Sequence, residues 1–386
     1  MHVIHYDEDR LRALNRRLEA VESFEHPDRV PCILLICERY LMDAVLGGYT
    51  LDYFSSARKM ADCQIAFAKW RSEHIFDDSV VAKVNIFPYF ENVSESGGLG
   101  CKILWSEKGP PRAIPFIEEP EDVDRFEVPD WERGEGLWGK KFRYYREMVD
   151  YAKSVDLTIN GKSTHPNVAY PGGLNLAPVT LAVDMVGMER LSAWMFRCPD
   201  VVHRLLNRIA DEEIRWEKYC RSLTDSKPKG IGISDDGAAY LSPELFKEFS
   251  VPYLNKIYDA FPGTRGLHMC GAVEHQLDMY SEDLRITHFS AFGYCVDPHV
   301  AAEKLGGRAV MSGNVDPQLI LNGPPSRIME AARHVIEAIA PYGGFILQDG
   351  ANICPGTPIE NMRAMLAAAE EYGKCQRVVK RSSEKA

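Results

Sequence analysis

Two soft metal ligands, His268 and Cys270, stand two residues apart in the segment Gly263-Thr-Arg-Gly-Leu-His-Met-Cys-Gly271. On an extended strand such residues point to the same face, so one ion could bind an imidazole nitrogen and a thiolate together. His-x-Cys pairs also arise by chance, and a buried cysteine is commonly a small apolar residue. The spacing is therefore weak support by itself, and the surrounding sequence must strengthen it.

Polar residues follow three other short apolar segments as well. They are Asp235-Asp-Gly237, Asn314-Val-Asp316 and the stretch from Asp349 to Cys354. Each alone is typical of a turn or a helix cap, since Asp, Asn and Gly are common there. Together they place carboxylate, amide and thiol groups at the ends of several predicted strands, which favours one shared site.

The elements that would position these groups alternate regularly along the chain. Predicted strands cover residues 29–37, 80–87, 156–161, 230–234, 266–270, 286–291, 308–312 and 344–348. Predicted helices cover residues 9–24, 58–76, 181–196, 201–222, 242–261, 273–281, 325–340 and 357–372. Eight parallel strands with crossover helices close most economically as a barrel, whose working face is the carboxyl end of its strands. The sequence therefore predicts an α/β fold of the (βα)8 TIM-barrel type.

The 386 residues are expected to form a single domain with an N-terminal helical extension. Between about residues 88 and 138 the pattern gives way to Gly, Pro and acidic residues, which indicates an irregular insertion with short strands. The charged residues 377–386 are expected to be a frayed tail.

Composition excludes several classes of function. A net charge of −11 without a basic cluster disfavours nucleic acid as a partner. No run of about 18 apolar residues predicts a membrane span, and the N-terminus does not resemble an export signal, which predicts a cytoplasmic protein. Scattered cysteines are typical of reduced thiols. We expect small-molecule chemistry.

Four segments share a further pattern. They are Asp235-Asp-Gly with Leu241-Ser-Pro-Glu-Leu-Phe-Lys-Glu-Phe and Pro252-Tyr, His268-Met-Cys-Gly, Ser312-Gly-Asn-Val-Asp-Pro317, and Gly343-Gly-Phe-Ile-Leu with Pro355-Gly-Thr-Pro-Ile-Glu-Asn-Met-Arg-Ala-Met365. Together they resemble the uroporphyrinogen decarboxylase superfamily, with coverage from about residue 176 to 372. The His-x-Cys pair resembles its branch of zinc-dependent, corrinoid-linked methyltransferases.

The resemblance implies a (βα)8 barrel and a zinc ion bound by His268 and Cys270, with a third ligand near the last strand. Similar methyltransferases place a cysteine directly after the glycine of the last strand's loop, where this chain has Ala351. Cys354 is the expected third ligand, with Asp349 or Asp235 as alternatives.

The decarboxylase resemblance departs at another point. Its arginine-rich signature after the first strand is reduced here to Leu34-Leu-Ile-Cys-Glu-Arg-Tyr40, with the single Arg39. Porphyrinogen decarboxylation is therefore disfavoured.

The resemblance thus implies a methyltransferase that moves a methyl group between a small methylated compound (ether, amine or thiol) and a corrinoid, for example as an O-demethylase component. The chain contains no Asp-x-His-x-x-Gly corrinoid-binding motif, so the corrinoid is expected on a separate protein. Asp235, Asp236 and Asn314 are the predicted catalytic residues.

One alternative is a metal-independent decarboxylase in which Asp235 or Asp236 stabilises a cationic intermediate. Another is a non-catalytic zinc- or corrinoid-binding module. A homo-oligomer is compatible with the sequence, which indicates neither the methyl donor nor the acceptor nor the direction of transfer.

Overall fold

Five parallel strands form the largest sheet of the protein. The computed structural model describes residues 2–107, 109–173, 176–224 and 228–374; the tail predicted at 377–386 lies outside them. The sheet has the order β12-β11-β10-β9-β8, with every neighbouring pair parallel. Its strands are β8 (Gly230–Ser234), β9 (Thr264–His268), β10 (His288–Ser290), β11 (Val310–Val315) and β12 (Phe345–Asp349). These are the last five predicted strands.

Three short segments supply the remaining strand positions. Cys32 forms a parallel bridge with Leu347 of β12, and the N–H of Asp78 donates to the carbonyl of Cys32 at 2.9 Å. Strand β2 (Asn85–Ile86) pairs in parallel with β7 (Asn167–Val168). Eight strand positions with intervening helices are the arrangement of a (βα)8 barrel.

The third strand of the barrel is β7, and the prediction that residues 156–161 fill this position was wrong. Strand β5 (Leu157–Ile159) instead pairs in parallel with β1 (His2–Ile4) and in antiparallel fashion with β6 (Lys162–Thr164), in a separate sheet. The cause is the Asn160-Gly161 pair, with φ of 49° and 77°. Asn-Gly with both residues at positive φ is a hairpin turn, which reverses the chain where a crossover helix was expected.

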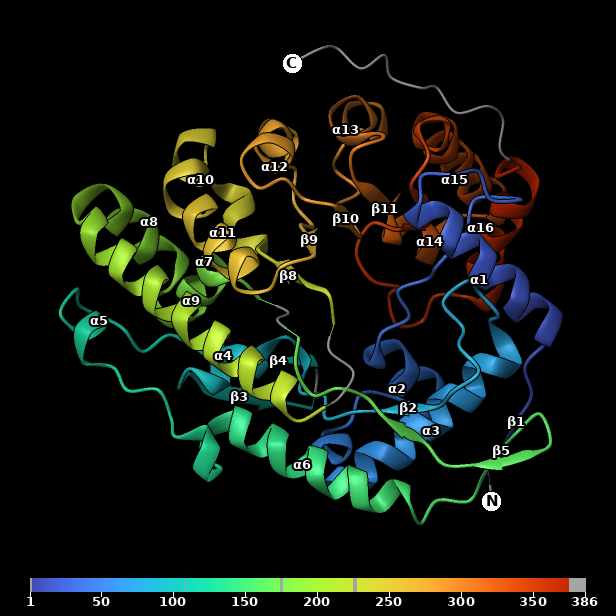
Figure 1. Ribbon diagram of the computed structural model, residues 1–386, viewed down its shortest axis with the longest axis horizontal. Coiled ribbons are helices and arrows are strands. Elements are labelled where there is room, and N and C mark those ends of the chain that lie inside the picture. Colours follow the sequence, from blue (N-terminus) through green and yellow to red (C-terminus); the bar gives the residue numbers. More distant parts are fainter. Residues whose placement is uncertain (1, 108, 174–175, 225–227, 375–386) are drawn as a thin grey trace.

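The helices lie around the strands in Figure 1, where α10, α12, α13, α15 and α16 form an arc outside β8 to β11. Their bounds are α1 (Glu8–Glu22), α2 (Glu38–Leu46), α3 (Ala57–His74), α4 (Ser94–Gly98), α5 (Asp122–Arg125), α6 (Gly136–Ala152), α7 (Pro178–Val186), α8 (Met188–Arg197), α9 (Pro199–Ser222), α10 (Pro243–Phe249), α11 (Val251–Ala260), α12 (Leu277–Glu282), α13 (Pro298–Leu305), α14 (Pro317–Asn322), α15 (Pro325–Ile339) and α16 (Ile359–Tyr372). No helix in the described ranges is long and apolar enough to cross a membrane.

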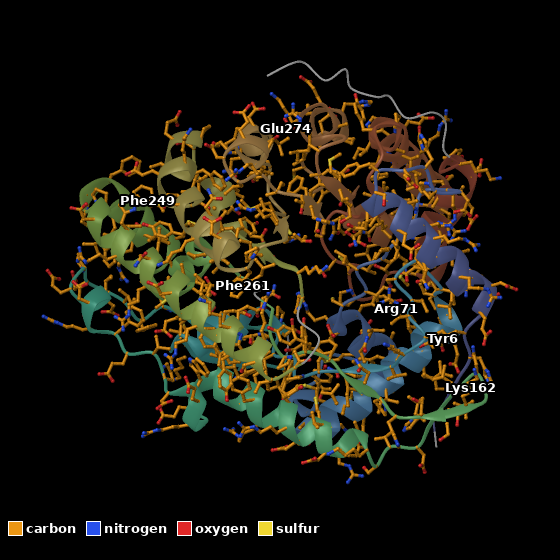
Figure 2. All side chains as sticks on the ribbon, in the orientation of Figure 1. Tyr6, Arg71, Lys162, Phe249, Phe261 and Glu274 are labelled. Atoms are coloured by element: carbon orange, nitrogen blue, oxygen red, sulfur yellow. The ribbon has the colours of Figure 1, made fainter. Side chains whose placement is uncertain are left out.

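Two predicted helices are each divided in the structure. The break between α7 and α8 falls at Gly187, whose φ of 94° is left-handed and does not continue a helix. The break between α10 and α11 falls at the buried Ser250. Phe249 and Phe261, at the ends of these two helices, are labelled in Figure 2 and are also buried.

The segment 88–138 is irregular, as the sequence indicated. It holds the hairpin of β3 (Lys102–Ser106) and β4 (Gly109–Ile114), together with short helices. Its Trp131 and the nearby Trp138 pack against Trp216 of α9, and the rings of Trp138 and Trp216 stack with centroids 4.6 Å apart. All three rings are buried, so this insertion is packed onto the outer helices.

Candidate metal centre

Asp236, His268 and Cys270 meet where two neighbouring strands end. His268 is the last residue of β9, and Asp236 begins the short helix η4 (Asp236–Tyr240) after β8. The register pairs Ser234 of β8 with His268, so two residues further on Asp236 and Cys270 lie side by side. One potential ligand atom from each of Asp236, His268 and Cys270 lies within 4.8 Å of the others, and no other such group of His, Cys, Asp or Glu side chains occurs in the ranges that the structure describes.

The distances within this group fit a single zinc ion. Nε2 of His268 lies 2.9 Å from Sγ of Cys270 and 3.8 Å from Oδ1 of Asp236. Zinc bonds of about 2.0 to 2.3 Å separate tetrahedral ligands by about 3.5 Å, a separation that lies between these two distances. Cys, His and Asp are also the side chains that zinc takes in proteins. The residues therefore fit the ion that the family resemblance implies.

His268 is oriented for binding by its other ring nitrogen. Nδ1 lies 2.9 Å from the carbonyl oxygen of Ser290 on β10. A carbonyl only accepts hydrogen bonds, so Nδ1 donates and, in the neutral ring, Nε2 carries the lone pair. This is the common arrangement in which a backbone carbonyl fixes the tautomer of a metal-binding histidine.

The surroundings of Cys270 disfavour the thiolate form as long as no cation is bound. Burial raises the pKa of the Cys270 thiol to about 12, and the negative charge of Asp236 adds to the rise. The backbone N–H of Cys270 also donates to Oδ1 of Asp236 at 2.7 Å, which fixes the carboxylate beside the thiol. A divalent cation between them would neutralise both anions and release the thiol proton.

Asp235, predicted as catalytic and as an alternative zinc ligand, has its carboxylate occupied elsewhere. Its Oδ1 accepts hydrogen bonds from the N–H and the hydroxyl of Thr180, both at 3.0 Å, and its Oδ2 accepts from Ser250 at 2.7 Å. It is fully buried, and burial raises its pKa to about 6. Asp235 thus ties the end of β8 to α7 and to the junction of α10 and α11, and it is not in the metal group.

Asn314, predicted as catalytic, is 5 % exposed. Its Nδ2 donates to the carbonyl oxygens of Gly293 at 3.1 Å and Val296 at 2.7 Å. These contacts hold the loop after β10. In that loop the N–H of Gly293 donates to the carbonyl oxygen of Met269 at 3.0 Å, and Met269 lies in the chain between His268 and Cys270. The contacts of Asn314 therefore position the wall of the site, and its catalytic role stays a prediction.

Cys354 lies outside the metal group. Its Sγ is 3.7 Å from Nε2 of Gln318 and 3.9 Å from the carbonyl oxygen of Asn352. Asp349 is fully buried, and its Oδ1 accepts a hydrogen bond from the N–H of Leu35 at 2.9 Å. The expected ligand role of Cys354 stays a prediction, and in the structure Asp236 is the third residue beside His268 and Cys270.

Residue spacing together with the strand register identifies Asp236 as the third member of the metal group. Side chains two apart share a face, so with Ser234 opposite His268 it is Asp236, and not Asp235, that falls on the face of Cys270. Finding it required the strand register, which the sequence alone did not supply.

Asp349→Asn is expected to remove one source of pH-dependent stability loss. Burial raises the pKa of Asp349 from 3.8 to about 6. The protonated Asp349 contributes its full stability below about pH 4, and this contribution is lost as the pH rises through 6 because the buried carboxyl group ionises. The amide of the variant does not ionise, so it has no such loss. The free energy of unfolding of the variant, relative to the unmodified protein, should therefore rise by up to about 3 kcal/mol between pH 4 and pH 7. Urea unfolding at several pH values measures this difference; a difference that is constant with pH would contradict it.

Comparison with known proteins places this chain in a family. Residues 13–372 match the family described as Uroporphyrinogen decarboxylase (URO-D). The chain is 31% identical over 281 residues to the methylcobamide:CoM methyltransferase MtaA of Methanosarcina barkeri (strain Fusaro / DSM 804), covering 71% of this chain and 76% of that protein. It is 26% identical over 354 residues to the uroporphyrinogen decarboxylase of Danio rerio, covering 87% of each chain.

A solved structure described as a methyltransferase from Methanosarcina mazei shares the fold. Its TM-score is 0.64 at 23% sequence identity, over 93% of this chain and 98% of that one. The predicted (βα)8 barrel and the predicted resemblance are both confirmed. Both methyltransferases and decarboxylases are among the relatives of this chain. The chain belongs to the uroporphyrinogen decarboxylase (URO-D) family.

Proposed function

We propose that this protein is a zinc-dependent methyltransferase that moves a methyl group between a small methylated compound (an ether, amine or thiol) and a separate corrinoid protein. The observation that carries the proposal is the group of Asp236, His268 and Cys270 at the carboxyl ends of β8 and β9. The relative that is 31% identical, whose name describes methyl transfer from a methylcobamide, supports it.

Three protein ligands suit a catalytic rather than a structural zinc site, because they leave a fourth position for a substrate atom. Bound zinc would supply a Lewis acid that holds the heteroatom of the small substrate. The chain's own residues do the rest: Ser290 orients His268, and Asp236 fixes the backbone of Cys270 through its N–H. Asp235, which precedes Asp236, holds that loop through Thr180.

The transfer itself is balanced without an external oxidant or reductant. The bond from the methyl carbon to its donor breaks with both electrons left on the donor, and the acceptor supplies the electron pair of the new bond. When the acceptor is a thiol, its proton is lost before attack, which suits a site that favours the thiolate form once a cation is bound.

A decarboxylase is the second candidate, favoured by the decarboxylase relative that matches 87% of the chain. Substrates with several carboxylates need several free cationic side chains. Arg39, the single arginine of the segment 34–40, is already paired with Glu91 at 3.3 Å. This pairing supports methyl transfer over decarboxylation of such substrates.

The test is zinc analysis followed by turnover with the purified full chain. We expect about one zinc per chain, and methyl transfer from at least one member of a panel of methylated ethers, amines and thiols to free cob(I)alamin, or in the reverse direction from free methylcobalamin to the demethylated compound. Carbon dioxide release that survives chelation would favour the decarboxylase. Zinc or cobalamin binding without any turnover would favour a non-catalytic binding module.

A further inference from the structure

The carboxylate of the metal centre lies on a short and partly exposed turn. The side chain of Asp236 is 41 % exposed, and the helix η4 that it begins is only five residues long. Fixing an exposed side chain and its backbone in one conformation costs conformational entropy, which weakens the binding of an ion. The affinity of Asp236 for a metal therefore depends on what holds η4 in place.

Thr180 of α7 holds the chain on both sides of Asp236. Its hydroxyl donates to Oδ1 of Asp235 at 3.0 Å and accepts the N–H of Gly237 at 2.9 Å. One hydroxyl can do both, because it has one donor and two acceptor lone pairs. A Cβ added at Gly237 would lie 2.9 Å from Cα of Thr180, so a glycine is needed for this close approach. Both chain neighbours of Asp236 are thus anchored to the same side chain.

Gln276 holds the other end of η4. It lies in the short helix η5 (Glu274–Gln276) and is fully buried. Its Nε2 donates to the carbonyl oxygens of Ala238 at 2.9 Å and Leu241 at 3.0 Å. Its Oε1 accepts a hydrogen bond from the hydroxyl of Tyr280 at 2.8 Å. Because both ends of the amide have partners, these contacts fix its orientation.

The segment with Gln276 also carries the metal ligand Cys270. The N–H of Cys270 donates to Oδ1 of Asp236 at 2.7 Å. The next residue, Gly271, packs so closely on η4 that an added Cβ would lie 2.5 Å from Cβ of Ala239. The loops after β8 and β9 are therefore joined along the length of η4, and this joint sets the position of the carboxylate relative to the thiol.

We propose that Thr180 and Gln276 are positioning residues of the metal centre, which hold η4 from two sides so that Asp236 meets His268 and Cys270 without rearrangement. This inference rests on the proposed function and assigns how the same site is held in place. Residues that orient a ligand without binding the ion typically change metal affinity by about 10- to 100-fold.

Thr180→Val replaces the hydroxyl by a methyl group of similar size, and it should lower the zinc affinity of the full chain at least about tenfold. Thr180→Ser keeps the hydroxyl and should stay within about threefold of the unmodified protein. Gly237→Ala should also weaken zinc, because its Cβ pushes α7 and η4 apart, and it preserves the test should the valine variant fail to fold. Competition with a chromophoric chelator measures all three. Unchanged zinc affinity in both Thr180→Val and Gly237→Ala would overturn the role of Thr180.

Gln276→Met removes both amide donors and should lower zinc affinity about tenfold. Asn361→Leu is the matched control, because Asn361 is also buried and its Nδ2 donates to the carbonyl oxygens of Ile320 at 2.8 Å and Gly323 at 3.0 Å. It removes the same kind of hydrogen bonds at another short helix, α14. We expect a similar loss of stability in urea but an unchanged zinc affinity. Equal zinc losses in both variants would assign the effect to general destabilisation and overturn the role of Gln276.

A combination with Asp236→Ala shows whether Thr180 acts through the carboxylate. In the Asp236→Ala protein, Thr180→Val should change zinc affinity less than about twofold, because no carboxylate remains to be positioned. A second loss as large as the first would reject the positioning role. The visible spectrum of the cobalt(II)-loaded protein gives a further readout, since it depends on the number and geometry of the ligands. Thr180→Val should shift this spectrum toward that of Asp236→Ala, and Thr180→Ser should not.

The same measurements keep the two proposals apart. Zinc binding that depends on Thr180 and Gln276, without methyl transfer to or from any compound, would keep the positioning role and reject the methyltransferase. Methyl transfer with an unchanged zinc affinity in every variant would keep the proposed function and reject the positioning role. An unmodified chain that binds no zinc would reject both.

Discussion

Cys270→Ser is expected to lower zinc content from about one ion per chain to below about a tenth, because a neutral hydroxyl replaces the thiolate ligand and only two ligands remain. The zinc affinity should fall by about three orders of magnitude, and methyl transfer should fall with it. Asp236→Asn should produce a smaller loss, since an amide oxygen remains a weak ligand at the same position. Metal analysis after gel filtration and competition with a chromophoric chelator measure both effects.

Cys354→Ser is the matched control for this experiment. Cys354 is partly exposed like Cys270 and follows strand β12, which β10 and β11 separate from β9, and its Sγ contacts Gln318 and Asn352. We expect its substitution to leave the zinc content unchanged. Loss of zinc in Cys354→Ser would establish Cys354 as a ligand in the loaded protein, and retention of zinc in Cys270→Ser would reject the proposed centre.

The position of the site was predictable because His-x-Cys ends a strand whose neighbours are regular. The last five strands are short apolar segments bounded by turn residues, and each returns in parallel after a helix, so their carboxyl ends converge. The third member of the metal group depends on register. Asp235 and Asp236 are adjacent, both are acidic, and only the pairing of Ser234 with His268 distinguishes them.

The first half of the chain was less predictable for a physical reason. The predicted strands at 29–37 and 80–87 contain Cys32 and β2, whereas β7, with only two paired residues, is too short for a periodic pattern to reveal. The longer and more strand-like segment at β5 pairs outside the barrel because the Asn160-Gly161 turn reverses it.

The sequence supplied the residue types of the site but not the direction of each carboxylate. Asp235 was predicted as a group that acts on the substrate or the metal. The structure shows a buried acceptor of three hydrogen bonds, two from Thr180 and one from Ser250. Its effect on the reaction would therefore pass through the position of Asp236, which shares its loop.

Asp235→Ala is expected to destabilise the protein by about 2 to 4 kcal/mol, because it leaves one buried donor, of Ser250, and two partly buried donors, of Thr180, without an acceptor. Asp235→Asn should cost less than about 1.5 kcal/mol, since its carbonyl oxygen can still accept from Thr180 and its amide can donate to the hydroxyl of Ser250. Urea unfolding at pH 7 compares the two. Zinc affinity should also fall in Asp235→Ala and remain in Asp235→Asn, because the backbone that carries Asp236 loses its anchor to α7 only in the first. A small and equal loss of stability in both variants would show that these hydrogen bonds do not hold the loop, and zinc loss in the amide variant alone would instead point to a direct role of the Asp235 charge.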